Sequence, residues 1–188
     1  MILQKKLCDI TEIVHSVAAE FQTLAEDKDL SLRMHLPANA VMCLVDREKI
    51  EQVFRNLLSN AAKFSPRSGV IDVALQPSDH KATLQVADQG PGVPEGELDK
   101  IFDKFIQSTR TTTGAGGTGL GLTISREITL GHGGRIWAQH AHPCGAVLCV
   151  ELPTHERDKP SEDVGANDRE RPWDSATESQ YCTALAEK

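Results

Sequence analysis

The sequence predicts an α+β fold, because stretches with the apolar period of a helix alternate with short apolar runs typical of strands. Two stretches, 10–24 and 46–64, carry apolar residues at the i, i+3/i+4, i+7 spacing of an amphipathic helix. Four short apolar runs form two pairs, each joined by turn-forming residues: 69–75 with 82–87, and 134–139 with 146–152. With 188 residues, the chain suits one globular domain and some additional chain.

The N-terminal part is predicted to form a helix followed by two strands. Asp9, with Glu12 three residues later, matches the capping-box pattern found at helix starts. After this helix come two short runs with strand character, 31–36 and 40–45, separated by a turn that contains proline. We therefore expect the first helix to lead directly into two consecutive strands.

Three further helices are predicted. The second long helix is expected to begin after Asp46, which is a favoured N-cap residue, and to end before Pro66. A short helix is expected over 95–105. A last helix is expected over 118–130, with Gly131 as its C-cap.

The composition excludes several classes of function. A net charge of −7 and an aromatic content of 4% argue against a nucleic-acid-binding protein. The five cysteines contain no CxxC pair, which indicates the reducing cytoplasm rather than a disulfide framework. No apolar run approaches the roughly 18 residues of a membrane span, so no membrane contact is expected for this chain. Whether a longer parent protein is anchored in a membrane is left open.

A polar stripe follows the second long helix. Asn56, Asn60 and Lys63 stand at i, i+4 and i+7, and this stripe lies roughly 120° from the centre of the apolar face. An amide oxygen can bind Mg²⁺ without adding charge, and a lysine one turn further along could contact a phosphate. An ordinary solvated helix face is the alternative.

The loop that follows the strand run 82–87 has the sequence Asp88-Gln-Gly-Pro-Gly-Val-Pro. A carboxylate at this position can accept a hydrogen bond from an exocyclic amine such as that of adenine. Gly90 and Gly92 lack the side chains that would keep the backbone away from a planar ring. A tight turn without a ligand is the alternative.

A glycine-rich run, 114–122, opens the last predicted helix. Backbone N–H groups at such a helix start form an anion-binding cradle suited to phosphates. A Rossmann fingerprint does not fit, because the polar stretch 108–113 precedes the run in place of a buried strand, and the lysine of a Walker A loop is missing. The polar stretch 108–117 is predicted to be a mobile loop, and a plain hinge is the alternative for the glycines.

In this order and spacing, the three features resemble the ATPase domain of two-component sensor histidine kinases, within the GHKL superfamily. The resemblance covers roughly residues 9–153 and rests on four motifs: an N box at 46–65, a first glycine box at 88–92, an F box at 101–105 and a second glycine box at 117–122. It implies a two-layer α/β sandwich, the Bergerat ATP-binding fold. In this fold helices back a mixed, mostly antiparallel sheet, and ATP lies under a lid.

The resemblance also implies roles for the residues that match these motifs. Asp88 would bind the adenine amino group, and Gly90 and Gly92 would shape the purine pocket. Asn60 would hold Mg²⁺, with Asn56 beside it.

Further roles concern the phosphates and the lid, which spans about 93–118. Lys63 would contact phosphate, and Arg110 in the lid could reach the γ-phosphate. Phe102 and Phe105 would anchor the lid. The phosphate-binding backbone would comprise Gly117, Thr118, Gly119, Leu120 and Gly121.

The same resemblance implies how the chain is divided. Residues 1–8 would be the remnant of a preceding dimerisation helix or linker, 9–153 the ATPase domain, and 154–188 a flexible tail or linker. The histidine to be phosphorylated is expected on a dimerisation domain of the same parent protein, with a response regulator as an indirect partner. The isolated chain is then expected to bind ATP without phosphorylating itself.

Two histidines are predicted to be structural. His15 lies within the first helix and lacks the acidic neighbour typical of a phosphoacceptor site. His132 follows the last helix, where a partly positive imidazole would interact favourably with the helix dipole.

Two other functions remain open at this point. The chain could be a GHKL serine kinase of the anti-sigma type, or a non-catalytic nucleotide-sensing module.

Overall fold

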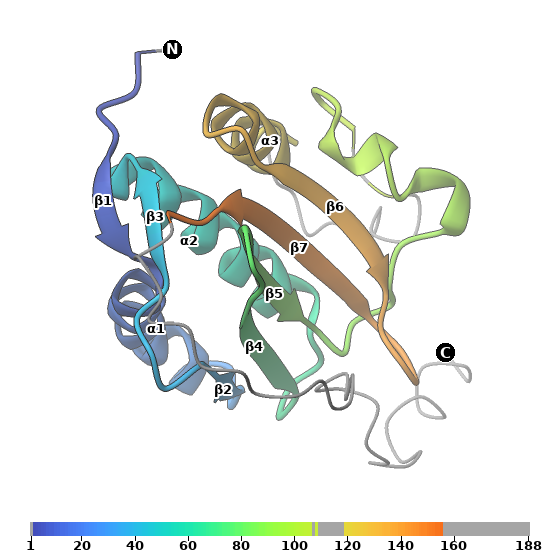
Figure 1. The fold of residues 1–188 in the computed structure, drawn as a ribbon. Coiled ribbons are helices and arrows are strands. Elements are labelled where there is room, and N and C mark those ends of the chain that lie inside the picture. Colours follow the sequence, from blue (N-terminus) through green and yellow to red (C-terminus); the bar gives the residue numbers. More distant parts are fainter. Residues whose placement is uncertain (1, 107, 109–118, 156–188) are drawn as a thin grey trace.

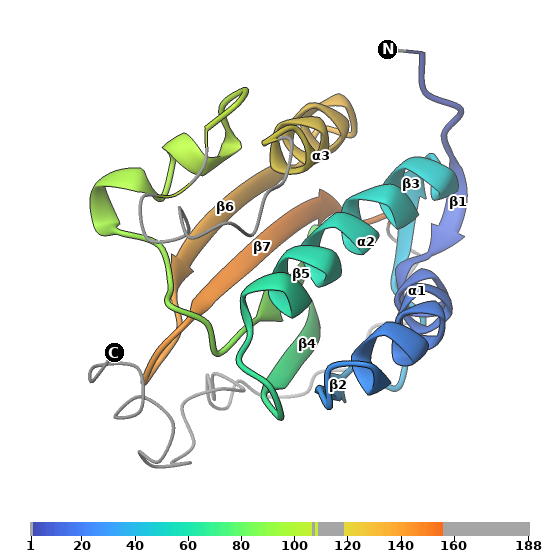
Figure 2. The same cartoon turned by 180° about the vertical axis from the view of Figure 1, so that it is seen from behind.

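The computed structural model describes residues 2–106, 108 and 119–155, and it arranges them as a sheet with helices packed on one face (Figures 1 and 2). The elements in chain order are β1 (Lys6–Asp9), α1 (Ile10–Glu26), β2 (Ser31–His35), β3 (Met42–Val45), α2 (Arg47–Phe64), β4 (Val70–Pro77), β5 (Lys81–Ala87), the 3₁₀ turns η1 (Glu95–Glu97) and η2 (Lys100–Phe102), α3 (Gly121–Gly131), β6 (Arg135–His140) and β7 (Ala146–Pro153).

The main sheet has five strands in the order β2-β4-β5-β7-β6. Strands β2 and β4 are parallel, and the other neighbours are antiparallel. The predicted α+β class, with a mixed and mostly antiparallel sheet in a two-layer sandwich, is therefore confirmed. Strand β7 lies between β5 and β6 in the sheet, although β5 and β7 are far apart in the sequence.

The core lies between the sheet and the helices. Alternate residues of β4, such as Ile71 and Val73, face the helices and are fully buried. On α2, Phe54 and Leu57 are fully buried as well, which confirms the apolar face predicted for this helix. Helix α2 packs against both α1 and α3 (Figure 2). A cavity between α3 and the sheet would therefore be bordered by α2.

The short helix predicted over 95–105 is wrong. The chain forms two single 3₁₀ turns there, and the backbone becomes extended at Asp103 and left-handed at Phe105, with φ +63°. Leu98, Ile101, Phe102 and Phe105 have the i, i+3, i+4, i+7 spacing of a helix, but a segment of only about three turns is marginal as an α-helix, so its contacts with the rest of the fold decide its conformation. The last helix begins at Gly121, later than predicted, and extends through Gly131, so that His132 and not Gly131 is its C-cap.

Residues 1–8, expected to be the remnant of a preceding dimerisation helix or linker, contain a strand, β1 (Lys6–Asp9), and not the end of a helix. It pairs with β3 in a separate two-stranded sheet, with Leu7 opposite Leu44. On the other side of β3, the His155 N–H donates to the Met42 carbonyl at 2.7 Å. The predicted tail 154–188 therefore begins with ordered contacts, and its residues 156–188 lie outside the described part of the chain.

The start of α2 is a junction of three segments. Asp46 caps α2 by accepting a hydrogen bond from the Lys49 N–H (3.3 Å), and it also accepts one from the Gln4 N–H (2.9 Å). The Asp46 N–H donates to Nε2 of the buried His132 (2.9 Å), whose Nδ1–H donates to the Ile128 carbonyl (2.8 Å). Asp46 therefore ties the N-terminal strand and the end of α3 to the same helix start.

His132 is a neutral imidazole in this arrangement, because a ring nitrogen that accepts a hydrogen bond carries no proton. Burial lowers the pKa of His132, which agrees with the neutral form. The predicted partly positive imidazole is therefore wrong, although the structural role is confirmed by these contacts. None of the described helices is long and apolar enough to cross a membrane.

We predict that Asp46→Ala lowers the free energy of unfolding by about 1–2 kcal/mol, because it removes the N-cap of α2 and the bond to Gln4. Asp46→Asn should cost less, since asparagine caps almost as well. Hydrogen bonds from Gln4 and Lys49 lower the pKa of Asp46, so the charged form contributes its stability at neutral pH and loses it in acid. Urea unfolding at neutral pH measures both variants, and equal stability of wild type and Asp46→Ala would contradict the capping role.

Candidate functional site

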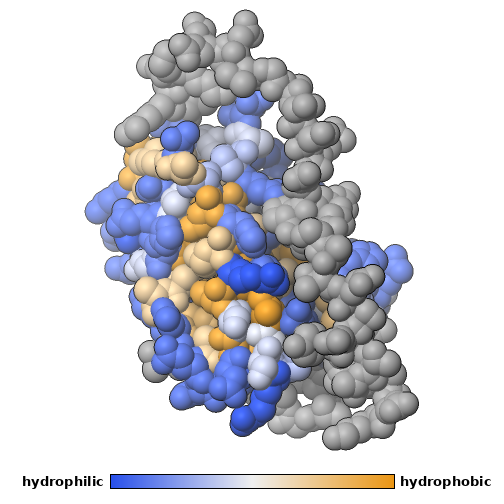
Figure 3. All heavy atoms as spheres, turned by 90° about the horizontal axis from the view of Figure 1, so that it is seen from below, coloured by the Kyte–Doolittle hydropathy of each residue, from blue (hydrophilic) through white to orange (hydrophobic). Residues whose placement is uncertain are grey.

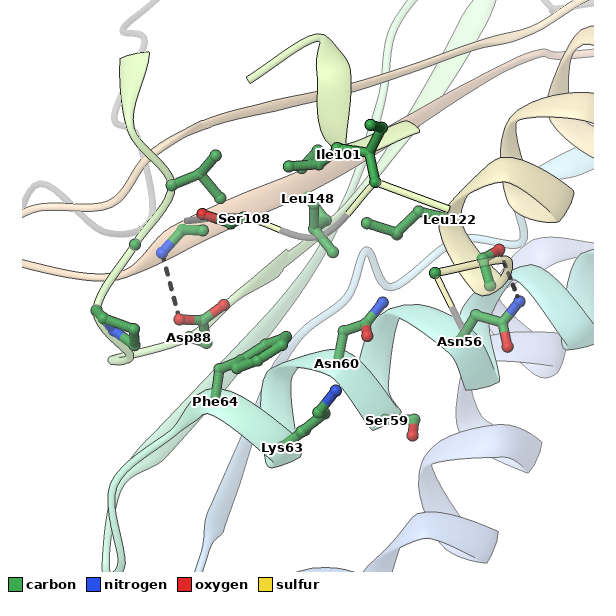
Figure 4. A pocket seen from close by; sticks show the side chains of 17 residues that line it. Asn56, Ser59, Asn60, Lys63, Phe64, Asp88, Ile101, Ser108, Leu122 and Leu148 are labelled. Atoms are coloured by element: carbon green, nitrogen blue, oxygen red, sulfur yellow. Dashed lines mark hydrogen bonds between the residues drawn. The ribbon is translucent and has the colours of Figure 1, made fainter. Parts of the chain in front are cut away.

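A cavity of about 360 Å³ lies between α2, the loop after β5, the start of α3 and the segment that contains η2 (Figure 4). This volume falls within the range of small-molecule sites. Its wall combines polar groups from α2 and β5 with apolar side chains from the sheet and the 3₁₀ segment. The lining residues are Asn56, Ser59, Asn60, Lys63, Phe64, Asp88, Pro91, Gly92, Val93, Ile101, Ile106, Ser108, Gly119, Gly121, Leu122, Ala146 and Leu148.

The polar stripe on α2 lines one side of the cavity, as Figure 4 shows. Asn60 is half-buried, and its amide has no hydrogen-bond partner among the described residues. The Nζ of Lys63 lies 4.8 Å from the centre of the Phe64 ring, which holds the ammonium group beside the cavity. Asn60 and Lys63 therefore present a neutral oxygen and a positive charge to the same space.

Asn56 is used differently from its neighbour Asn60. Its Nδ2 donates to the Gly121 carbonyl at 3.1 Å and to the Ser125 Oγ at 3.2 Å, and both partners belong to α3. The Asn56 amide therefore joins the first turn of α3 to α2. Its Oδ1 remains the only atom of that amide for a ligand.

Asp88 follows β5 directly and lies at the opposite side of the cavity from α3 (Figure 4). Its carboxylate is 8% exposed, and Oδ1 accepts hydrogen bonds from the Gly90 N–H (2.8 Å) and the Ala146 N–H (3.3 Å). No described residue donates to Oδ2. Burial raises the pKa of Asp88 to about 6, against the opposing effect of these two hydrogen bonds. One carboxylate oxygen is thus fixed by the protein and the other is available to a ligand.

The two glycines of the loop after β5 have different functions. Gly92 lines the cavity and has φ +71°, a left-handed conformation that favours glycine. Gly90 does not line the cavity. A Cβ on Gly90 would lie 2.7 Å from the Phe64 carbonyl oxygen, so this glycine permits the close contact between the loop and the end of α2.

The start of α3 faces the cavity with Gly119 and Gly121. Gly119 has φ +67°, and a Cβ there would lie 3.1 Å from the Phe105 Cα. Leu120 precedes the first helical residue and does not line the cavity, whereas Leu122 does. The first N–H groups of a helix have no partner within the helix, and Gly119 and Gly121 at this helix start line the same cavity as Asn60 and Lys63.

Phe105 does not occupy the place that the sequence prediction gave it. Its side chain is 73% exposed and does not line the cavity, and its backbone, which is left-handed, lies close to Gly119. Phe102 is buried at 3% exposure, as expected of an anchor. Arg110, Gly117 and Thr118, with most of the predicted lid, lie outside the described residues.

The sequence prediction missed the apolar part of the cavity wall. Leu148 on β7 and Ile101 on η2 lie across the cavity from α2 in Figure 4, and Ala146 stands beside Asp88. The apolar run 146–152 predicts that Leu148 is buried, but not that it lines the same cavity as Asp88, because this depends on β7 pairing with β5. These side chains provide the apolar surface that a planar ring would need.

The comparisons with known proteins all indicate the same family. Residues 45–156 match the model of the histidine kinase-, DNA gyrase B- and HSP90-like ATPase family. The chain is 35% identical over 159 residues to hybrid signal transduction histidine kinase D of Dictyostelium discoideum, covering 81% of the chain and 10% of that protein. It is 32% identical over 146 residues to the adaptive-response sensory kinase SasA of Synechococcus sp. (strain CC9311), covering 77% of the chain and 38% of that kinase. The chain therefore spans between a tenth and two-fifths of these relatives.

Solved structures agree with this result. The mycobacterial sensor histidine kinase MprB superposes with a TM-score of 0.73 at 28% identity, covering 81% of this chain and 100% of that one. Full-length ShkA in complex with AMPPNP superposes with a TM-score of 0.73 at 25% identity. The match covers 86% of this chain and 33% of ShkA. Histidine kinase ThkA in complex with the response regulator TrrA superposes with a TM-score of 0.70 at 26% identity. The match covers 81% of this chain and 42% of that one.

We predict that Asp88→Asn stabilises the ligand-free fold at pH 7.5 by roughly 1–3 kcal/mol, because it removes a buried charge and keeps an acceptor for Gly90 and Ala146. The folded-state pKa of about 6 exceeds the ordinary 3.8. The cost of the charge is therefore fully present above pH 6 and disappears as the pH falls towards 3.8.

Urea unfolding of wild type and Asp88→Asn at several pH values measures this difference. The stability gap should shrink as the pH is lowered from 7.5 to 4.5. A gap that stays constant with pH would mean that Asp88 carries no raised pKa in the folded protein.

Proposed function

This chain belongs to the histidine kinase-, DNA gyrase B- and HSP90-like ATPase family, and we propose that it presents the γ-phosphate of Mg·ATP to a histidine on a separate helical domain. It is a catalytic ATP-binding domain of the sensor histidine kinase type in two-component signalling. The observation that carries the proposal is the shared cavity: Asp88, Asn60 and the start of α3 line one space of about 360 Å³.

Adenine is proposed to lie at the Asp88 end of the cavity. The Oδ2 of Asp88 would accept a hydrogen bond from the exocyclic amine, because Oδ1 is already engaged by two backbone N–H groups. The side chains of Leu148 and Ile101 supply apolar surface for the ring faces. The low exposure of Asp88 strengthens this contact, because water does not compete for the carboxylate.

The triphosphate is proposed to extend from Asp88 towards the start of α3. Backbone N–H groups at Gly119 to Gly121 and the ammonium group of Lys63 would neutralise its charge. The residues present fit a magnesium ion, because the Asn60 amide lines the cavity without a protein partner. Among the described residues no cluster of three or more His, Cys, Asp or Glu side chains could hold a metal. Phosphate oxygens and water would therefore supply most of the ligands. Bound Mg²⁺ would neutralise phosphate charge.

Transfer to histidine demands mainly that the phosphoryl group is positioned and its charge is neutralised. In this proposal α2 and α3 fix the triphosphate, and the accepting imidazole approaches from another domain. His15 does not meet this requirement, since it lies exposed on α1, which packs on the side of α2 away from α3 (Figure 2). None of the residues that line the cavity is a histidine.

The partners and the domain limits follow from the same proposal. The histidine-bearing dimerisation domain would belong to the same parent protein, and a response regulator would receive the phosphoryl group afterwards; ThkA was solved with such a regulator. We also propose that 9–153 forms the ATPase unit, with β1 packed against it. The free thiols of Cys8 and Cys43 agree with a cytoplasmic location.

We predict that Asp88→Asn weakens ATP binding roughly 10- to 100-fold and favours inosine triphosphate instead. The variant keeps an oxygen for Gly90 and Ala146 and turns an amide donor towards the base, where inosine carries an acceptor in place of the amine. Calorimetry with both nucleotides, with and without Mg²⁺, measures the change. Unchanged relative affinity for the two nucleotides would refute the base contact.

The 188-residue chain is predicted to remain unlabelled when it is incubated with γ-labelled Mg·ATP, because no histidine lies at the cavity among the described residues. Calorimetry on the same sample should show that ATP is bound. Labelling that disappears in His15→Gln would overturn this assignment and identify His15 as a phosphoacceptor.

A further inference from the structure

The turn between β6 and β7 packs directly on the loop that carries Asp88. The Asp88 N–H donates to the Ala146 carbonyl at 2.9 Å, and the Ala146 N–H donates back to Oδ1 of Asp88 at 3.3 Å. The turn is closed by a hydrogen bond from the Ala141 N–H to the Gly145 carbonyl at 3.2 Å. The turn 141–145 therefore lies directly beside the carboxylate, although it is nearly 60 residues further along the chain.

Gly145 is the point of closest approach. It has φ +100°, and a Cβ on it would overlap the Asp88 carbonyl oxygen and lie 2.7 Å from the Asp88 carbonyl carbon. The contact continues to Gly92, where a Cβ would lie 2.8 Å from the Gly145 carbonyl oxygen. Two glycines thus face each other between the turn and the loop, and neither position has room for a methyl group.

These contacts fix where the carboxylate stands. Asp88 is held on its backbone by Gly145 and Ala146 and on its side chain by the Ala146 and Gly90 N–H groups. A displacement of the turn would move the Asp88 backbone and withdraw one of the two donors from Oδ1. The free Oδ2 would then lose its direction towards the cavity.

We propose that Gly145 is a positioning residue that determines base specificity: by letting the β6–β7 turn reach the Asp88 carbonyl, it aims the free carboxylate oxygen at an exocyclic amine. Gly145 does not line the cavity and would touch no ligand. The proposal rests on the proposed adenine contact of Asp88. Gly145 lies outside the four sequence motifs on which the resemblance to sensor histidine kinases rests.

The test is a comparison of two glycine variants at opposite ends of the β6–β7 hairpin. Gly145→Ala inserts a methyl group against Asp88, and Gly134→Ala inserts one against the Glu151 carbonyl, far from the cavity. Both methyl groups clash with backbone, so both variants should be destabilised. We expect only Gly145→Ala to reduce the preference for ATP over inosine triphosphate, by roughly tenfold or more, which corresponds to the loss of one charged hydrogen bond.

A double-mutant cycle separates positioning from general loosening. In the Asp88→Asn background, Gly145→Ala should change the ATP affinity by less than about twofold, because the contact that it misaligns has already been removed. Gly134→Ala should have the same effect in both backgrounds. Independent effects of Gly145→Ala and Asp88→Asn would overturn the proposal.

A second variant covers the case in which Gly145→Ala does not fold by circular dichroism. Because His140 and Ala146 are paired, residues 141–145 can be replaced by Asn-Gly, which joins antiparallel strands in a two-residue turn. This shortened hairpin keeps the sheet and removes Gly145 from Asp88. It should show the same loss of nucleotide preference, and retention of the wild-type preference would overturn the proposal.

Different results would contradict the adenine contact of Asp88 and the positioning role of Gly145. If Asp88→Asn does not alter the relative affinity for ATP and inosine triphosphate, the adenine contact itself is wrong. If Asp88→Asn alters it and Gly145→Ala behaves like Gly134→Ala, the adenine contact stands and only the role of Gly145 is wrong.

Discussion

The antiparallel pairing of β5 with β7 is the constraint on which the site depends. It runs from Lys81 opposite Pro153 to Ala87 opposite Val147, and it ends where Asp88 begins. Since alternate residues of a strand face opposite sides of the sheet, the same register turns Leu148 towards the helices and the cavity. A slip by one residue would bury the wrong face and remove the N–H group that Ala146 donates to Asp88.

Two buried titratable side chains, Asp88 and His132, change the stability of the fold with pH. The charged form of Asp88 is disfavoured by burial, and this lowers the stability of the fold above the pKa of Asp88. His132 is also buried, and as a neutral acceptor it links α3 to the cap of α2. Lowering the pH relieves the cost at Asp88 and penalises His132, whose pKa lies below its ordinary value. The two effects on stability therefore oppose each other in weak acid.

Most features that depend on local sequence could be predicted, with the segment 95–105 as an exception, and those that depend on distant pairing could not. The apolar period of α2, its cap at Asp46 and the loop after β5 were predicted correctly, since each follows from neighbouring residues. The strand β1 was missed because only its partner β3 gives it a reason to be extended. Gly145 carried no local signal either, since the clash that requires glycine there is with a residue nearly 60 positions away.

Helix α2 sets the geometry of the whole phosphate region. Asn56 uses its amide to hold the start of α3, while Asn60, one turn further along, faces the cavity. The distance between the proposed phosphate-binding helix start and the proposed magnesium ligand is therefore fixed by a single helix. In the proposed function the two asparagines therefore have different roles: Asn56 would position the helix start that binds the phosphates, and the amide of Asn60 would be available to Mg²⁺.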